Sequence, residues 1–124
     1  MKHGSQLRVG SVLAQLEELL TKAPEKIKDV VARYPTRHGV YAISDPEDFK
    51  IVYVGMSKTG KKGVGQRLWD HLNNKGAAVL KSMVGGDKKK AGEYLVRVIE
   101  EDDFITRRNL EALAIGALSP EHNK

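Results

Sequence analysis

Apolar residues recur every three or four positions in the first third of the chain, which is the spacing of one buried face of a helix. The pattern starts at Ser11, whose hydroxyl can cap the first turn, and runs to Ala23. Pro24 suits the first turn of a second helix, which ends before Pro35 because a residue that precedes proline avoids the helical region. We therefore predict an N-terminal helical hairpin.

The pattern then changes to two short β-rich runs, at residues 40–43 and 51–54. The segment between them, Ser-Asp-Pro-Glu-Asp, favours a turn, so an antiparallel hairpin is the simplest interpretation. Such a hairpin places Tyr41 and Tyr53 on neighbouring strands. Residues 94–99 predict a third strand.

Helical patterns follow at residues 66–72 and 77–84, and the sequence GGDKKK at 85–90 predicts a flexible basic loop. A last helix can be capped by Asp102 or Asp103 and ends where proline interrupts the pattern. Its buried side would hold Phe104, Leu110, Leu113, Ala114 and Ala117.

These elements predict the fold class α/β, of the α+β type: a small three-stranded antiparallel sheet flanked by helices, with the N-terminal helical hairpin beside it. A chain of 124 residues suits a single globular unit. We expect a core domain over residues 37–124 and a helical extension over residues 1–36 that packs on it.

Composition narrows the expected location. No stretch approaches the ~20 apolar residues that span a bilayer, and the first residues lack the apolar middle of a secretory signal. The sequence contains no cysteine, so it offers neither a disulfide framework nor a thiolate metal cluster. We expect a non-secreted, cytoplasmic protein without a membrane partner.

The net charge of +5 is concentrated in one segment, because residues 56–92 contain nine basic and two acidic side chains. Such an excess is typical of a surface that binds a polyanion such as nucleic acid, and a solvated lysine surface is the simpler alternative. The candidate phosphate-binding residues are Lys58, Lys61, Lys62, Lys88, Lys89 and Lys90.

Two tripeptides and the residues that follow them offer the groups that phosphodiester hydrolysis needs. Gly39-Val40-Tyr41 and Tyr53-Val54-Gly55 supply phenols, and the chain then continues to Arg67, His71, Glu111 and Asn123. Hydrolysis requires a positioned water, a base for its proton and positive charge on the phosphate oxygens.

Local spacing and residue type suggest a role for three of these side chains. Arg67 and His71 are four positions apart, so on a helix they share one face. The guanidinium can bind two phosphate oxygens at once. Glu111 offers the hard oxygen ligand that Mg²⁺ or Mn²⁺ prefers, although local sequence alone favours a solvated helix glutamate.

In its residues and their order, the segment from Gly39 to Asn123 resembles the GIY-YIG nuclease family. Both tripeptides differ from the family name only by valine for isoleucine, and the later residues stand at the family's positions for arginine, histidine or tyrosine, glutamate and asparagine. Met56 stands where some members carry lysine, so Lys58 is the nearest substitute. Members include excision-repair incision subunits, homing endonucleases and some restriction enzymes, so DNA repair or recombination is the implied setting.

The resemblance implies a metal-dependent DNA endonuclease that hydrolyses phosphodiester bonds by in-line attack of water. It implies Mg²⁺ or Mn²⁺ on Glu111, a phosphate held by Arg67, and a water activated or oriented by His71. Tyr41 would be the base and Tyr53 would orient it, although an ordinary phenol, with a pKa of about 10, costs roughly 4 kcal/mol to ionise at neutral pH. Asn123 would steady the site through hydrogen bonds.

Four alternatives are left by the sequence. A catalytically silent nucleic-acid-binding module with the same fold is the main alternative, and RNA remains possible beside DNA as the ligand. A protein partner or a homo-oligomer could supply target selection. The run from Gly55 to Lys61 also fits most of a phosphate-binding loop, but Lys62 replaces the hydroxyl residue that would bind Mg²⁺.

Overall fold

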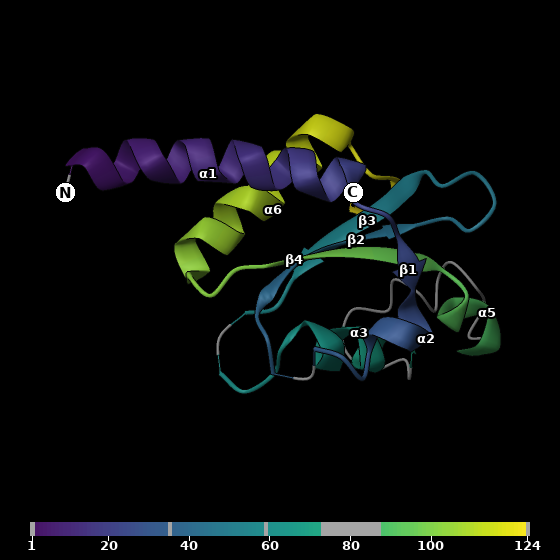
Figure 1. Cartoon of the computed structure of the whole chain (residues 1–124). Coiled ribbons are helices and arrows are strands. Elements are labelled where there is room, and N and C mark those ends of the chain that lie inside the picture. Colours follow the sequence, from purple (N-terminus) through teal and green to yellow (C-terminus); the bar gives the residue numbers. More distant parts are fainter. Residues whose placement is uncertain (1, 35, 59, 73–87, 124) are drawn as a thin grey trace.

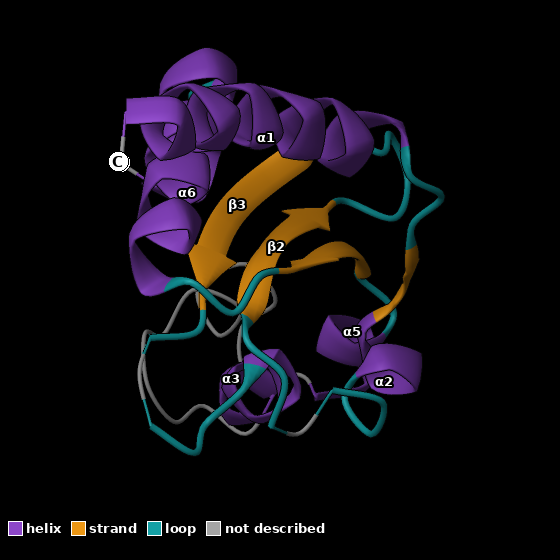
Figure 2. Ribbon diagram, turned by 60° about the vertical axis from the view of Figure 1, so that its left-hand side comes forward, coloured by secondary structure: helices purple, strands orange, loops and turns teal. Residues whose placement is uncertain are grey.

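A four-stranded antiparallel sheet separates two layers of helices in the computed structural model, which describes residues 2–34, 36–58, 60–72 and 88–123 (Figures 1 and 2). The strand order is β1-β4-β2-β3, so β3 lies at one edge. The strands are β1 (Glu25–Lys26), β2 (Gly39–Ser44), β3 (Ile51–Met56) and β4 (Leu95–Glu100).

Helices cover both faces of this sheet. The long helices α1 (Lys2–Thr21) and α6 (Phe104–Leu118) pack together on one face. The shorter helices α2 (Ile27–Val30), α3 (Val64–Leu72) and α5 (Lys88–Gly92) lie on the other, as Figure 1 shows. A 3₁₀ turn, η1 (Glu121–Asn123), follows α6 and contacts β3.

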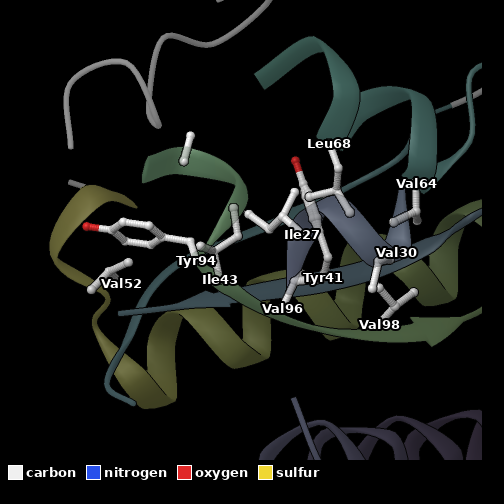
Figure 3. Close-up of a cluster of buried hydrophobic side chains, with 11 residues drawn as sticks. Ile27, Val30, Tyr41, Ile43, Val52, Val64, Leu68, Tyr94, Val96 and Val98 are labelled. Carbon is white, nitrogen blue, oxygen red and sulfur yellow. The ribbon is translucent and has the colours of Figure 1, made fainter. Parts of the chain in front are cut away.

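The central strand β2 is apolar almost throughout instead of alternating, and its position explains why. All six of its residues are buried because each face of the strand meets helices. Tyr41 and Ile43 enter the core beneath α2 and α3, together with Leu68 (Figure 3). Val40 and Ala42 point the other way and enter the core formed with α1 and α6.

The α+β class is confirmed, and the details differ from the sequence prediction at the N-terminus. The sheet has a fourth strand, because residues 25–26 pair with Val96 and Leu95 instead of starting a helix. The second helix is reduced to the single turn α2. The predicted helical hairpin is therefore not a hairpin: α1 and α2 pack on opposite faces of the sheet, joined by β1.

Other boundaries also shift. The first helix begins at Lys2, so Ser11 lies inside α1 and does not cap it. Residues 88–90, expected as loop, instead start α5. The helix predicted at 77–84 lies outside the described residues. The last helix is capped as expected, with the Asp103 side chain accepting a hydrogen bond from the backbone N–H of Thr106 at 2.9 Å.

Of the helices in the described part of the chain, none combines the length and the apolar character that a membrane span requires.

The glycine of the first tripeptide is required by close packing within the sheet. A methyl group on Gly39 would collide with the backbone carbonyl of Ile99 on β4. We predict that Gly39→Ala lowers the free energy of unfolding by about 1–3 kcal/mol, because a backbone neighbour cannot move aside. The measurement is urea denaturation followed by circular dichroism.

Gly116 provides the matched control, since it lies in α6 and a methyl group there meets no atom within 4 Å. Gly116→Ala should raise the free energy of unfolding by about 0.5–1 kcal/mol through helix propensity. Equal effects of the two substitutions would contradict the packing argument.

Candidate active site

The Tyr41 side chain lies across the neighbouring strand because the residue opposite it has no side chain. Tyr41 pairs with Gly55 in the β2–β3 register. A methyl group on Gly55 would come within 2.5 Å of the Tyr41 hydroxyl and 2.6 Å of its ring. The glycine of the second tripeptide thus makes room for the phenol of the first.

Tyr41, Tyr53 and His71 form one cluster between the sheet and α3. Their ring centroids are 6.3 Å apart for the two tyrosines, 6.0 Å for Tyr41 and His71, and 5.9 Å for Tyr53 and His71. The Tyr41 hydroxyl and His71 Nε2 are 3.0 Å apart, within hydrogen-bond distance. Tyr41 is fully buried and His71 is 3% exposed, so the pair is shielded from bulk water.

Electrostatic interactions connect this cluster with residues of α3 and α6. Burial raises the pKa of Tyr41 far above its ordinary value; Tyr53 and Glu111 add to this, and the Arg67 guanidinium opposes it. The pKa of Tyr53 is raised by burial and by Glu111, again against the effect of Arg67. Both phenols therefore lie within reach of one cation and one carboxylate.

Glu111 is half-buried on α6, and burial raises the pKa of its carboxyl group, while Lys58 and Arg67 lower it. The predicted residues Tyr41, Tyr53, Arg67 and Glu111 thus lie close enough to act on one another's charge, although they come from β2, β3, α3 and α6. The β2–β3 pair brings them together, because α3 contacts β2 from one face of the sheet and α6 contacts β3 from the other.

Arg67 has a donor that the described residues do not use. Its Nε atom is buried and makes no hydrogen bond. Leaving a charged donor buried without a partner is unfavourable, by about 1–3 kcal/mol or more. Because Nε is itself buried while the residue as a whole is only partly buried, an anion such as phosphate could meet the guanidinium only at its other nitrogens.

Asn123 binds the outer edge of β3. Its Oδ1 accepts a hydrogen bond from the backbone N–H of Val54 at 2.8 Å, and its Nδ2 donates to the Val54 carbonyl at 2.9 Å. The amide thereby satisfies both backbone groups of an edge strand, next to Tyr53 in the chain. These hydrogen bonds fix the strand that carries Tyr53.

Solved structures support the fold that this geometry suggests. The GIY-YIG N-terminal endonuclease domain of UvrC from Thermotoga maritima, bound to its catalytic divalent cation magnesium, superposes with a TM-score of 0.58 at 22% identity, covering 79% of this chain and 96% of that chain. A point mutant of the same domain, with a phenylalanine in place of a tyrosine, gives a TM-score of 0.58 at 22% identity, with 79% and 94% covered.

This chain has the GIY-YIG fold. No protein-family model matches the sequence, and no curated protein matches it either. At this level of identity, the similarity establishes the fold, and the roles of individual residues have to be argued from their geometry.

The donor set of this candidate site is compatible with one kind of metal. No group of three or more His, Cys, Asp or Glu gathers anywhere in the described residues, so the site does not offer the three or four protein ligands that Zn²⁺ takes. Mg²⁺ is commonly held by one or two carboxylates, with waters and substrate phosphates completing the shell. Glu111, a half-buried carboxylate within electrostatic reach of Arg67, is compatible with this second pattern.

The predicted phosphate-binding lysines differ in their surroundings. Lys58, Lys61, Lys89 and Lys90 are exposed, whereas the side chain of Lys88 lies outside the described part of the chain. Lys62 is exposed but forms an ion pair with the buried Asp70, at 3.2 Å.

Sequence reasoning missed two buried charged residues near the site. Asp70 on α3 is 6% exposed and accepts hydrogen bonds from Lys62 and Gln66. Arg107 on α6 is 1% exposed and donates to backbone carbonyls. The burial of Arg107 could have been predicted from helical spacing. It lies three positions before Leu110 and seven before Ala114, on the apolar face of its helix.

The raised pKa of Tyr41 predicts a specific loss of stability in alkali. An unfolded tyrosine ionises near pH ~10, whereas the folded phenol holds its proton to higher pH. The stability that Tyr41 contributes in this way is present below pH ~10 and is lost as the pH rises above it, with a slope of up to about 1.4 kcal/mol per pH unit. Tyr41→Phe should remove that part of the slope.

Urea denaturation at several values between pH ~9 and pH ~12, a range that brackets the ionisation of an unfolded tyrosine, measures the slope. Ultraviolet absorbance follows phenol ionisation in the same samples. If the unaltered chain and Tyr41→Phe lose stability in parallel over this range, the phenol is not held neutral by burial.

Proposed function

We propose that this protein is a metal-dependent DNA endonuclease that hydrolyses phosphodiester bonds by in-line attack of water. The observation that carries the proposal is the buried hydrogen-bonded pair of Tyr41 and His71, with Arg67 and Glu111 in electrostatic contact. The similar UvrC structures, described as an endonuclease domain with its catalytic magnesium, support it. The catalytic unit would be residues 37–124, with residues 1–36 as an extension.

In this mechanism, the partly buried guanidinium of Arg67 would hold the scissile phosphate and neutralise the charge that develops on the non-bridging oxygens. Glu111 would hold Mg²⁺ or Mn²⁺, which supplies Lewis-acid stabilisation of the phosphate and of the leaving oxygen when it is bound. Asn123 keeps β3, and with it Tyr53, in place.

Proton transfer is assigned to the buried pair. A phenol with a raised pKa is a poor base if it must first become a free phenolate. The His71 Nε2 atom, 3.0 Å from the phenol oxygen, removes this difficulty, because it can accept the phenol proton as the phenol takes one from water. Histidine is suited to this task because its charge changes near neutral pH.

DNA is the proposed substrate, with RNA as the second candidate. The exposed lysines at positions 58, 61, 89 and 90 would bind flanking phosphates. DNA repair or recombination is the proposed setting, and a protein partner or a second copy of the chain would supply target selection. The lack of cysteine supports a reducing, cytoplasmic location for this activity.

The main alternative is a binding module with the same fold that does not cut. Glu111→Gln separates the two, because it removes the metal-binding charge while keeping the shape of the side chain. We predict that this variant cleaves at least about 100-fold more slowly with Mg²⁺, because a main source of charge stabilisation is removed, while its affinity for DNA is retained. Cleavage of labelled linear, nicked, flapped and branched DNA measures the rate.

Glu18→Gln, at an exposed position of α1, is the matched control and should cut as fast as the unaltered chain. Binding of DNA without cleavage by all three proteins, on every substrate and with either Mg²⁺ or Mn²⁺, would favour the silent module.

The lysines can be tested separately from catalysis. Every lysine that no longer reaches a phosphate should reduce the slope of log K against log salt concentration by about one unit. Glutamine at Lys58, Lys61, Lys89 and Lys90 together should therefore flatten the salt dependence of DNA binding, measured by fluorescence anisotropy without Mg²⁺. Lys50→Gln, in the exposed turn between β2 and β3, is the control. An unchanged slope in the fourfold variant would remove these lysines from the interface.

A further inference from the structure

Arg107 makes an unusual set of contacts for a buried arginine. Its Nε donates to the Ser57 carbonyl at 3.1 Å, and its Nη2 donates to the Lys58 carbonyl. Its Nη1 donates to the carbonyls of Glu101 and Asp102, at 2.9 and 2.8 Å. The guanidinium therefore binds four backbone oxygens from two separate loops.

Within the described part of the chain, no carboxylate forms an ion pair with Arg107. The Phe104 ring lies 5.6 Å from its Cζ. Burying a cation is unfavourable, and a well-packed apolar side chain would often stabilise a core equally well. Stability alone therefore does not account for an arginine at this position.

The two loops that Arg107 connects flank the candidate active site. Ser57 and Lys58 follow β3 directly, and Glu101 and Asp102 precede α6. Arg107 lies one helical turn before Glu111 on α6, so the same helix carries the metal-binding candidate and the residue that fixes the loop of Lys58.

A second contact holds the same loop from the side of β2. His38 Nδ1 lies 3.0 Å from the Ser57 hydroxyl, and its Nε2 lies 3.0 Å from the Gly60 carbonyl. The Ser57 hydroxyl also accepts a hydrogen bond from the Gly39 N–H at 2.9 Å. The exposed Lys58 side chain thus extends from a backbone segment that is fixed on both sides.

We propose that Arg107 is a positioning residue of the active site: by binding the Ser57 and Lys58 carbonyls against α6, it fixes the Lys58 ammonium beside Glu111, where it meets a DNA phosphate. This inference rests on the proposed function, because it needs Lys58 to contact the substrate. A lysine at position 107 could not replace the arginine, since an ammonium is a point donor without the planar fork that reaches several carbonyls.

A double-mutant cycle on DNA affinity tests this assignment in the full-length chain. We expect Lys58→Ala and Arg107→Lys each to weaken binding by about threefold to tenfold, the range of coupled neighbouring residues. The double variant should bind no more weakly than Lys58→Ala alone, because Arg107 acts through Lys58. Binding to a labelled DNA duplex is measured by anisotropy without Mg²⁺, at a temperature where melting curves show every variant folded.

Arg97→Lys is the matched control, because Arg97 also donates to a backbone carbonyl, that of Lys22, at 2.6 Å, but from β4, which does not pair with β3. It should leave DNA affinity unchanged. If the fold-losses of DNA affinity in Lys58→Ala and Arg107→Lys multiply in the double variant, the inference is overturned. It is also overturned if either single variant binds DNA as tightly as the unaltered chain.

Arg107→Met, which removes the charge, guards against a trivial result. If neither Arg107 variant shows a cooperative melting transition, even when the scan starts at low temperature, neither is folded. Arg107 then serves the fold as a whole, and the positioning role is overturned. The cycle measures binding alone, so it can succeed in a protein that does not cut. The reverse outcome is also distinguishable. If cleavage depends on Glu111 but the effects at positions 58 and 107 multiply, the proposed function stands and only this inference is refuted.

Discussion

Burial of one phenol on the central strand is the constraint on which the site depends. Tyr41 can lie across β3 only because Gly55 leaves the space open, and it is fully buried there beneath α3. Burial raises the pKa of the phenol, so the same packing that orients the hydroxyl also makes it a weak acid. Two neighbouring groups oppose this effect of burial on the phenol. Arg67 favours the ionised oxygen, and the Nε2 of His71 lies within hydrogen-bond distance of the hydroxyl, where it can accept the proton.

The strand that the Tyr41 side chain lies across, β3, is at the edge of the sheet. An interior strand would be covered by neighbours on both sides, whereas an edge strand leaves one side open. Asn123 covers part of that side by binding both backbone groups of Val54. Arg67 and His71 lie on α3, on one face of the sheet, and Glu111 lies on α6, on the other. The cation and the carboxylate that act on the two phenols therefore come from opposite helical layers.

Much of this arrangement could be predicted from the sequence, and the failures have identifiable causes. The strands that carry Tyr41 and Tyr53, the placement of Arg67 and His71 on one helix and the Asp103 cap follow from local patterns, which a single sequence displays. Strand β1 could not be predicted in this way, because residues 25–26 are extended only through pairing with the distant residues 95–96 of β4. The partners of Arg107 were hidden for a related reason, since they are backbone carbonyls and no side-chain motif marks them.

The two arginines near the site differ in how many of their hydrogen-bond donors have a partner. The guanidinium of Arg107 donates to four backbone carbonyls, which leaves few N–H groups for a ligand. These hydrogen bonds hold the loop after β3 against the loop before α6. Arg67 is only partly buried, its Nε lacks a partner, and its charge acts on both tyrosines of the site. Residue type alone would give both arginines the same function. Counting which donors are satisfied separates Arg107, whose donors bind backbone carbonyls, from Arg67, whose Nε has no such partner.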